Sequence, residues 1–178
     1  FELLAKKKNT ELNSPIKDKS NNYFSFLVFS RLFKETEEKA KANGISIENV
    51  LDEVWLMVRR YYKIFEEWYQ NRTLYHLIGY LISIGYSVEA IKNDVNNLKK
   101  TETVLYLKNI IAKDNVKIGD ISQLTYTDDR VNVKKILLLF NVISLENNSN
   151  SNTKFPFELY KKEQWDIEHI HAISSKIP

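Results

Sequence analysis

The chain has 178 residues, of which 43% are hydrophobic and 12% aromatic, with only four Gly and three Pro. This composition excludes a disordered or collagen-like chain and suits one domain, or one core with part of a second. The absence of Cys excludes disulfides and thiolate metal sites, and it favours a cytoplasmic protein. Basic residues exceed acidic ones by only 26 to 23, so the net charge of +3 indicates neither a nucleic-acid nor a membrane partner.

The N-terminal segment, residues 1–22, is polar and rich in lysine, and Pro15 interrupts any helix there. We expect a short apolar turn followed by a loop, a tail outside the main fold. Because the sequence begins with Phe1 rather than Met and ends at Pro178, we expect it to be a piece of a longer protein. No apolar run reaches the roughly 18 residues of a membrane span, so no membrane association is expected.

Apolar residues recur at helical spacing through residues 23–146, which predicts a helical bundle. The expected helices run from about Tyr23 to a stop at Gly44, from Ser46 to Trp68, from Arg72 to Ile84, from Ser87 to about Lys99, from Thr101 or Thr103 onward, and through residues 134–142. The run 136–140 would also suit a buried strand, although its length and the Asp before it favour a helix. The predicted fold is mainly α, an irregular bundle of about six helices with a short C-terminal extended segment.

The segment 72–84 is apolar on almost every side, which is typical of a central, buried helix. Gly79 in its middle costs about 1 kcal/mol relative to Ala, and close contact with a neighbouring helix would compensate. His76 lies between Tyr75 and Leu77, and we interpret it as a core histidine bonded to a backbone or tyrosine group rather than as a catalytic residue.

The segment Asn147–Thr153 consists of Asn, Ser and Thr, so residues 147–154 are predicted to be a polar linker and the domain boundary. The pattern changes beyond it. Because Pro156 disfavours the α region for the residue before it, a regular helix is not expected at 155–157. Residues 165–171 alternate with period two, which predicts a strand.

That strand carries the strongest chemical signal, because two of the three histidines lie in it beside two carboxylates. On strand spacing, His169 and His171 share one face, and Asp166 and Glu168 share the other. Two imidazoles on one face can bind a divalent metal. An imidazole beside a metal-binding carboxylate also suits phosphodiester hydrolysis, which needs an activated nucleophile and a cation that offsets phosphate charge.

The string Trp165-Asp166-Ile167-Glu168-His169-Ile170-His171-Ala172 resembles the first strand and turn of an HNH, or ββα-metal, nuclease. In that family an acidic residue binds Mg²⁺ or a similar ion, and the following His deprotonates the attacking water. The resemblance implies that Glu168 is the metal ligand and His169 the general base, with Asp166 and His171 accessory. It also implies that Mg²⁺ or Mn²⁺ is the cofactor.

Further segments occur in a fixed order before this motif: Trp68-Tyr69, Leu74–Leu81, Lys135–Val142 and Phe155-Pro156-Phe157. The ordered set, over about residues 46–172, resembles the region between the two modules of GmrSD-type, modification-dependent restriction endonucleases. Those proteins join an N-terminal ParB/sulfiredoxin-like NTPase module to a C-terminal HNH nuclease. The resemblance implies a bacterial defence enzyme against phage, with DNA and the NTPase-like module as partners.

Two departures qualify the resemblance. No DGQQR-like string is present, which places the nucleotide-binding module outside this chain. The sequence also stops nine residues after His169, before the second strand and the helix of an HNH finger, so residues 155–178 would be only the start of the nuclease module. We therefore expect this fragment to bind no metal and to cut no DNA alone, with residues 155–178 loose or docked on the bundle.

Two alternatives remain from the sequence. The bundle is a protein-interaction module with no catalytic role, which an exposed apolar patch would favour. Or it is a helical DNA-binding domain, which a contiguous basic face and a steep salt dependence of binding would favour.

Overall fold

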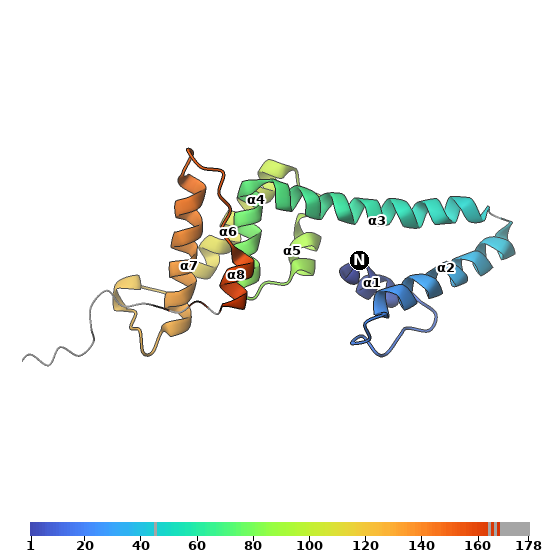
Figure 1. Cartoon of the computed structure of the whole chain (residues 1–178), viewed down its shortest axis with the longest axis horizontal. Helices are drawn as coiled ribbons and strands as arrows, with labels where there is room; N and C mark the ends of the chain where they lie inside the picture. The colour runs from blue at the N-terminus through green and yellow to red at the C-terminus, as the bar shows by residue number, and fades with distance from the viewer. Residues whose placement is uncertain (45, 164, 166, 168–178) are drawn as a thin grey trace, which may run out of the picture. The chain divides into compact units, whose positions relative to one another are not determined.

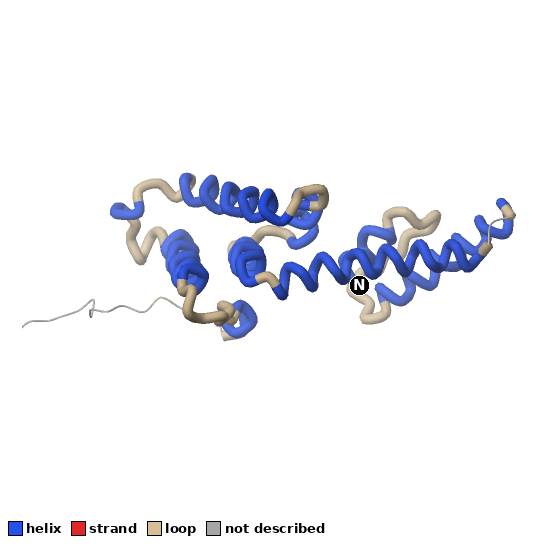
Figure 2. The backbone as a smooth tube through the Cα atoms, turned by 90° about the horizontal axis from the view of Figure 1, so that it is seen from above, coloured by secondary structure: helices blue, strands red, loops and turns tan. Residues whose placement is uncertain are grey.

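A computed structural model describes residues 1–44, 46–163, 165 and 167. Figure 2 shows helices and loops but no strand among these described residues. The α-helices are α1 (Glu2–Asn9), α2 (Phe24–Asn43), α3 (Ile47–Gln70), α4 (Arg72–Ser83), α5 (Val88–Val95), α6 (Lys100–Val116), α7 (Arg130–Asn147) and α8 (Phe157–Lys162), and a 3-10 turn covers Ile121–Gln123. The predicted mainly α fold is confirmed, and α2–α7 correspond to the six predicted helices.

The chain forms two compact units, residues 1–67 and residues 68 onward, and Figure 1 labels the helices that belong to them. The boundary falls near the C-terminal end of α3, whereas the sequence predicted one bundle over 23–146. The reason is that two separate sets of helices pack: α1 against α2, and α4 against α6, α7 and α8. No helix in the described part of the chain combines the length and apolarity needed to cross a bilayer.

The prediction that residues 1–22 are a loop or tail is wrong for its first half, because α1 packs against α2. Ala5 and Leu12 join Phe24 and Val28 in a buried cluster. Ala, Leu and Lys favour helix, and an ion pair of 2.7 Å between Lys6 Nζ and Glu2 Oε1 spans one turn. Burial of the apolar face then stabilises α1, which single-sequence propensity underestimates.

The loop after α1 is fixed by one buried side chain. Asn9 Nδ2 donates to the Ile16 carbonyl at 3.0 Å, and the Ile16 N–H donates to Asn9 Oδ1 at 2.7 Å. Farther along the unit, α2 ends at Gly44 in the left-handed conformation, with φ of +65°, as the sequence predicted.

In the second unit α4 is the central helix, as predicted. Leu74, Leu77 and Leu81 on this helix are all buried. The helix begins after Asn71, whose side chain accepts from the Leu74 N–H at 3.0 Å. Its neighbours α6, α7 and α8 all pack against it.

The region 130–147 is helical rather than a strand, which confirms the predicted choice between the two. The predicted Asp cap is not formed, because Asp129 Oδ2 instead accepts from the Thr125 N–H at 3.0 Å. The helix expected from Ser87 is α5, and the Ser87 side chain caps it by accepting from the Ala90 N–H at 3.4 Å.

The C-terminal region differs from the predicted extended segment, because α8 forms at Phe157–Lys162 directly after Pro156. The fixed φ of Pro suits the position before a first helical turn. Glu158 in the first turn and Lys161 and Lys162 in the last turn also complement the helix dipole. The predicted strand 165–171 lies outside the described residues, apart from positions 165 and 167.

Candidate functional site

The four residues proposed for the nuclease site, Asp166, Glu168, His169 and His171, lie outside the residues that the structure describes. The chain that leads to them is described, and it is held in place. We call residues 148–163, which follow α7 and include α8, the C-terminal strap. Figure 1 shows α8 beside α4, and the contacts between the strap and α4 form the candidate functional site.

His76 is the centre of this site. Its side chain is fully buried, with 0% exposed, and both ring nitrogens have partners. The Phe155 N–H of the strap donates to His76 Nε2 at 3.0 Å, and His76 Nδ1 lies 2.7 Å from Glu146 Oε2 of α7. An amide N–H can only donate, so Nε2 is unprotonated and Nδ1 carries the proton that Glu146 accepts. His76 is therefore neutral and joins α4 to both α7 and the strap.

Glu146 is shared between two residues of α4. Its other oxygen, Oε1, accepts from Thr73 Oγ1 at 2.5 Å. Burial raises the pKa of the Glu146 carboxyl, but the hydrogen bonds from Thr73 and His76 and the charge of Arg72 outweigh it, so the pKa lies below its ordinary value of 4.5. The carboxylate is thus held ionised, as an acceptor for His76.

Arg72 fastens the loop between α7 and α8. Its guanidinium donates to the carbonyls of Leu145, Asn148 and Thr153, with distances of 3.3 Å to Asn148 and 3.3 Å to Thr153. Leu145 is in the last turn of α7, where its carbonyl also accepts from the Asn148 N–H at 3.1 Å, so Arg72 adds a second donor at this helix end. Residues 147–154 are therefore tied to α4 within the second unit, and they do not separate two units as the sequence predicted.

Contacts of Lys154 and Tyr75 also hold the strap in place. Lys154 Nζ donates to the Tyr69 carbonyl and lies 4.1 Å from the centre of the Tyr69 ring and 5.0 Å from that of Tyr75. The Tyr75 hydroxyl donates to the Phe155 carbonyl at 3.0 Å. Both backbone groups of Phe155 are thus bound by consecutive residues of α4, namely Tyr75 and His76.

Gly79 provides the space that α8 occupies. A Cβ at this position would lie closer than 3.0 Å to three ring atoms of Phe157. The close contact that the sequence predicted for Gly79 is confirmed, and its partner is an aromatic ring rather than a helix backbone. Phe157 also packs against Tyr75, with ring centres 5.5 Å apart, and against Phe155 at 4.8 Å.

The contacts of this site hold a segment of the chain in place. Phe155 is 3% exposed and His76 is inaccessible, and the two nitrogens of His76 are already engaged. Over the described residues, no three His, Asp or Glu side chains gather in a way that could hold a metal ion. The predicted role of His76 as a core histidine bonded to backbone is confirmed.

Sequence reasoning missed the partners of His76. Glu146 ends an apolar helical run just before the polar linker, where no local pattern marks it as a partner of His76, and Phe155 is 79 residues from His76. The available signal was a polar residue on a helix that is apolar on every side, since such a residue needs partners from elsewhere in the chain.

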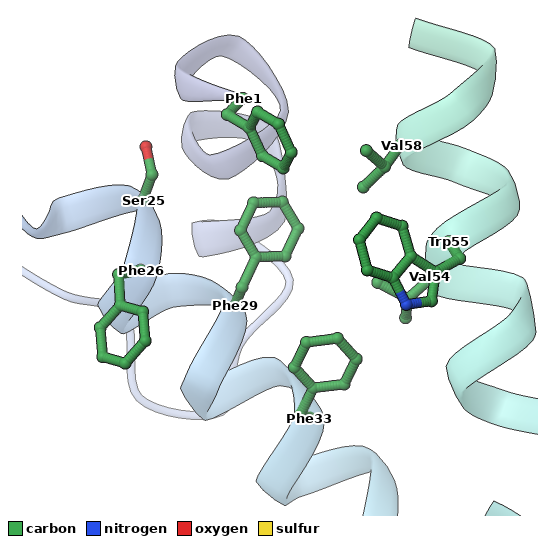
Figure 3. A pocket seen from close by; sticks show the side chains of 8 residues that line it. All are labelled: Phe1, Ser25, Phe26, Phe29, Phe33, Val54, Trp55 and Val58. Carbon is green, nitrogen blue, oxygen red and sulfur yellow. The ribbon is translucent and has the colours of Figure 1, made fainter. Parts of the chain in front are cut away.

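The first unit has a separate feature, an open apolar pocket of about 330 Å³. Figure 3 shows Phe29 and Phe33 of α2 on one side of it and Val54, Trp55 and Val58 of α3 on the other. Trp55 remains 61% exposed. The Trp55 side chain is thus only partly covered within the first unit.

Comparisons of the chain with protein-family models, with curated proteins and with solved structures found no match.

Proposed function

We propose that this chain is the helical linker region of a defence-type, metal-dependent DNA endonuclease that restricts foreign, modified DNA. The second unit serves as the nuclease mount, by which we mean the packed helices that hold the strap leading into the first part of an HNH nuclease module. In the full-length protein Glu168 binds Mg²⁺ or Mn²⁺, and His169 activates water for attack on a phosphodiester, with Asp166 and His171 accessory. The chain alone cuts no DNA.

One observation supports the mount: the strap that leads into the Glu168–His169 motif is fixed on α4. Phe155 is held at both backbone groups, and Phe157 fills the space at Gly79. Glu168 is only the fifth residue after Glu163, and such a connection spans at most roughly 18 Å. A short connection to the fixed strap limits how far Glu168 can lie from α4, and phosphodiester hydrolysis is sensitive to misplacement of its catalytic groups.

The ordered sequence segments give independent support. Three of them fall in the packed part of the second unit: Leu74–Leu81 on α4, Lys135–Val142 on α7 and Phe155–Phe157 on the strap. Residues within them, His76 and Phe155, contact each other directly. Two of the segments on which the resemblance rests, Leu74–Leu81 and Phe155–Phe157, therefore contact each other where the strap docks on α4.

The experiment is a DNA cleavage assay on the full-length protein, with Mg²⁺ or Mn²⁺, with modified and unmodified DNA, and with and without nucleotide. His169→Ala is compared with His171→Ala, which removes a neighbouring imidazole of the same kind. We expect wild-type cleavage to be lost with His169→Ala and largely kept with His171→Ala. Cleavage that survives His169→Ala, or the absence of cleavage by a folded wild-type protein under every condition, contradicts the proposal.

A second candidate is the protein-interaction module, which the apolar pocket of the first unit favours. Phe26 and Trp55 line the pocket and are 69% and 61% exposed. Large apolar side chains that gather in an exposed patch are typical of a protein-interaction site. The partner tested first is a second copy of the chain, by sedimentation over a range of concentrations. Association that Trp55→Ser abolishes supports this candidate, and a monomer at every concentration contradicts self-association.

A further inference from the structure

We infer that His76 is a proton-sensitive latch, which holds the C-terminal strap on α4 when it is neutral and releases it when it is protonated. The latch follows from the contacts of His76 alone and is independent of the proposed nuclease activity.

The first step is the loss of an acceptor. Neutral His76 offers the lone pair of Nε2 to the Phe155 N–H at 3.0 Å. Protonation converts Nε2 into an N–H donor, so two donors would face each other inside a buried site. A buried donor without an acceptor is costly, and here both groups would lack one. Protonated His76 is therefore incompatible with the docked strap.

The second step is the fate of the positive charge. The imidazolium would keep Nδ1–H donation to Glu146, 2.7 Å away, after the strap has left. Glu146 remains ionised at the pH where histidine side chains titrate, because Thr73 and His76 donate to it. The released state thus contains a paired charge, whereas the docked state would contain clashing donors. This difference couples proton uptake to release of the strap.

The other charged and titratable groups around the latch do not remove this coupling. On α4 itself, Arg72 is engaged with backbone carbonyls and Tyr75 donates to the Phe155 carbonyl. On the strap, Lys154 lies over the rings of Tyr69 and Tyr75. Burial raises the pKa of the Tyr75 hydroxyl, and the negative charge of Glu158 on α8 adds to this effect. On α6, the negative charge of Asp114 adds to the effect of burial in raising the pKa of Tyr80, which lies one helical turn after His76.

Release of the strap can be followed at Phe155, which is buried and lies beside aromatic side chains while the strap is docked. The Trp165 ring packs at 5.7 Å from the ring of Phe155 and at 5.8 Å from that of Tyr160. When Phe155 leaves α4, its burial is lost and its amide becomes accessible to exchange with solvent. The Phe155 amide is therefore the direct reporter, and the amides of α4 and α7 report whether the helices remain folded.

Two substitutions separate the roles of the two ring nitrogens. His76→Gln places a carbonyl oxygen near the position of Nε2, so it keeps an acceptor for Phe155 that does not titrate. His76→Asn places its amide near Nδ1, so it keeps donation to Glu146 and loses the acceptor. The test measures hydrogen exchange of the intact chain at about pH 7.5 and about pH 5.5, a range in which histidine side chains change protonation.

We expect wild-type protection of the Phe155 amide, corrected for intrinsic exchange, to fall about tenfold or more at the lower pH, as loss of a buried hydrogen bond implies. His76→Gln is expected to protect this amide equally at both pH values, and His76→Asn at neither. Equal wild-type protection at both pH values overturns the latch, and so does a His76→Gln variant that responds to pH as the wild type does.

If either variant fails to fold, imidazole ¹⁵N NMR of the wild-type chain tests the same latch. The expected signals at about pH 7.5 are those of a protonated Nδ1 and an unprotonated Nε2, with Nε2 protonated only when the Phe155 amide loses protection. A protonated Nε2 while the strap is docked contradicts it.

Discussion

The contact between Gly79 and Phe157 gives the sharpest expected effect of a single substitution, Gly79→Ala. In a helix with free space at this position, Ala would stabilise the folded protein by about 1 kcal/mol over Gly. Here the new Cβ would lie closer than 3.0 Å to three atoms of the Phe157 ring. Overpacking of this kind costs about 1–3 kcal/mol, so the net effect expected is a loss of up to about 2 kcal/mol.

The control is the same substitution in a Phe157→Ala background. Without the ring the space is open, and Gly79→Ala is expected to stabilise the second unit by about 1 kcal/mol. The two effects differ in sign, which gives a coupling free energy of about 1–3 kcal/mol in a double-mutant cycle.

The assay is urea unfolding followed by tryptophan fluorescence in a Trp55→Phe background. The remaining tryptophans, Trp68 and Trp165, then both report on the second unit. A Gly79→Ala protein more stable than wild type, or a coupling near zero, would refute the account of how α8 docks on α4.

Three further substitutions test other contacts of the second unit. Arg72→Lys is expected to cost about 1–3 kcal/mol in unfolding free energy, because one ammonium cannot reproduce the guanidinium's contacts with three carbonyls; a loss below about 0.5 kcal/mol in urea unfolding would contradict this. Glu146 has a lowered folded-state pKa, so its contribution to stability is complete above the ordinary value of 4.5 and is lost as the pH falls through the folded-state pKa. Glu146→Gln should remove this part of the acid dependence of the urea midpoint, and an unchanged pH profile would argue against the Thr73–Glu146–His76 contacts. The Tyr80 hydroxyl is buried without a hydrogen-bond partner among the described residues, and burial, with a smaller effect of Asp114, raises its pKa to about 12. Tyr80→Phe should therefore change the unfolding free energy by no more than about 1 kcal/mol in either direction, and a larger loss would reveal a partner for that hydroxyl.

The helices of the second unit could be predicted because their signals are local. The apolar surface of α4 and the Ser87 cap each depend on residues within one or two turns. Gly79 was informative for a similar reason: a costly residue in a buried helix indicates a close neighbour, although not which one.

The errors arose where distant contacts outweigh local preference. Residues 1–22 form α1 and a loop because Ala5 and Leu12 pack against buried residues of α2. No local sequence pattern indicates this contact. The Asn-rich segment was predicted to be a polar linker at a domain boundary, but Arg72 supplies hydrogen bonds to its backbone from 76 and 81 residues away. Both cases follow from tertiary contacts that single-sequence patterns do not encode.

The role of the second unit as a nuclease mount is tested most directly by the cleavage rate of the full-length protein with His76→Gln and His76→Asn, next to wild type and His169→Ala. The account predicts that His169→Ala abolishes cleavage, that His76→Gln cleaves like wild type, and that His76→Asn cleaves more slowly although its helices stay folded. Wild-type cleavage by His76→Asn, with the strap shown to be released by exchange of the Phe155 amide, would contradict it.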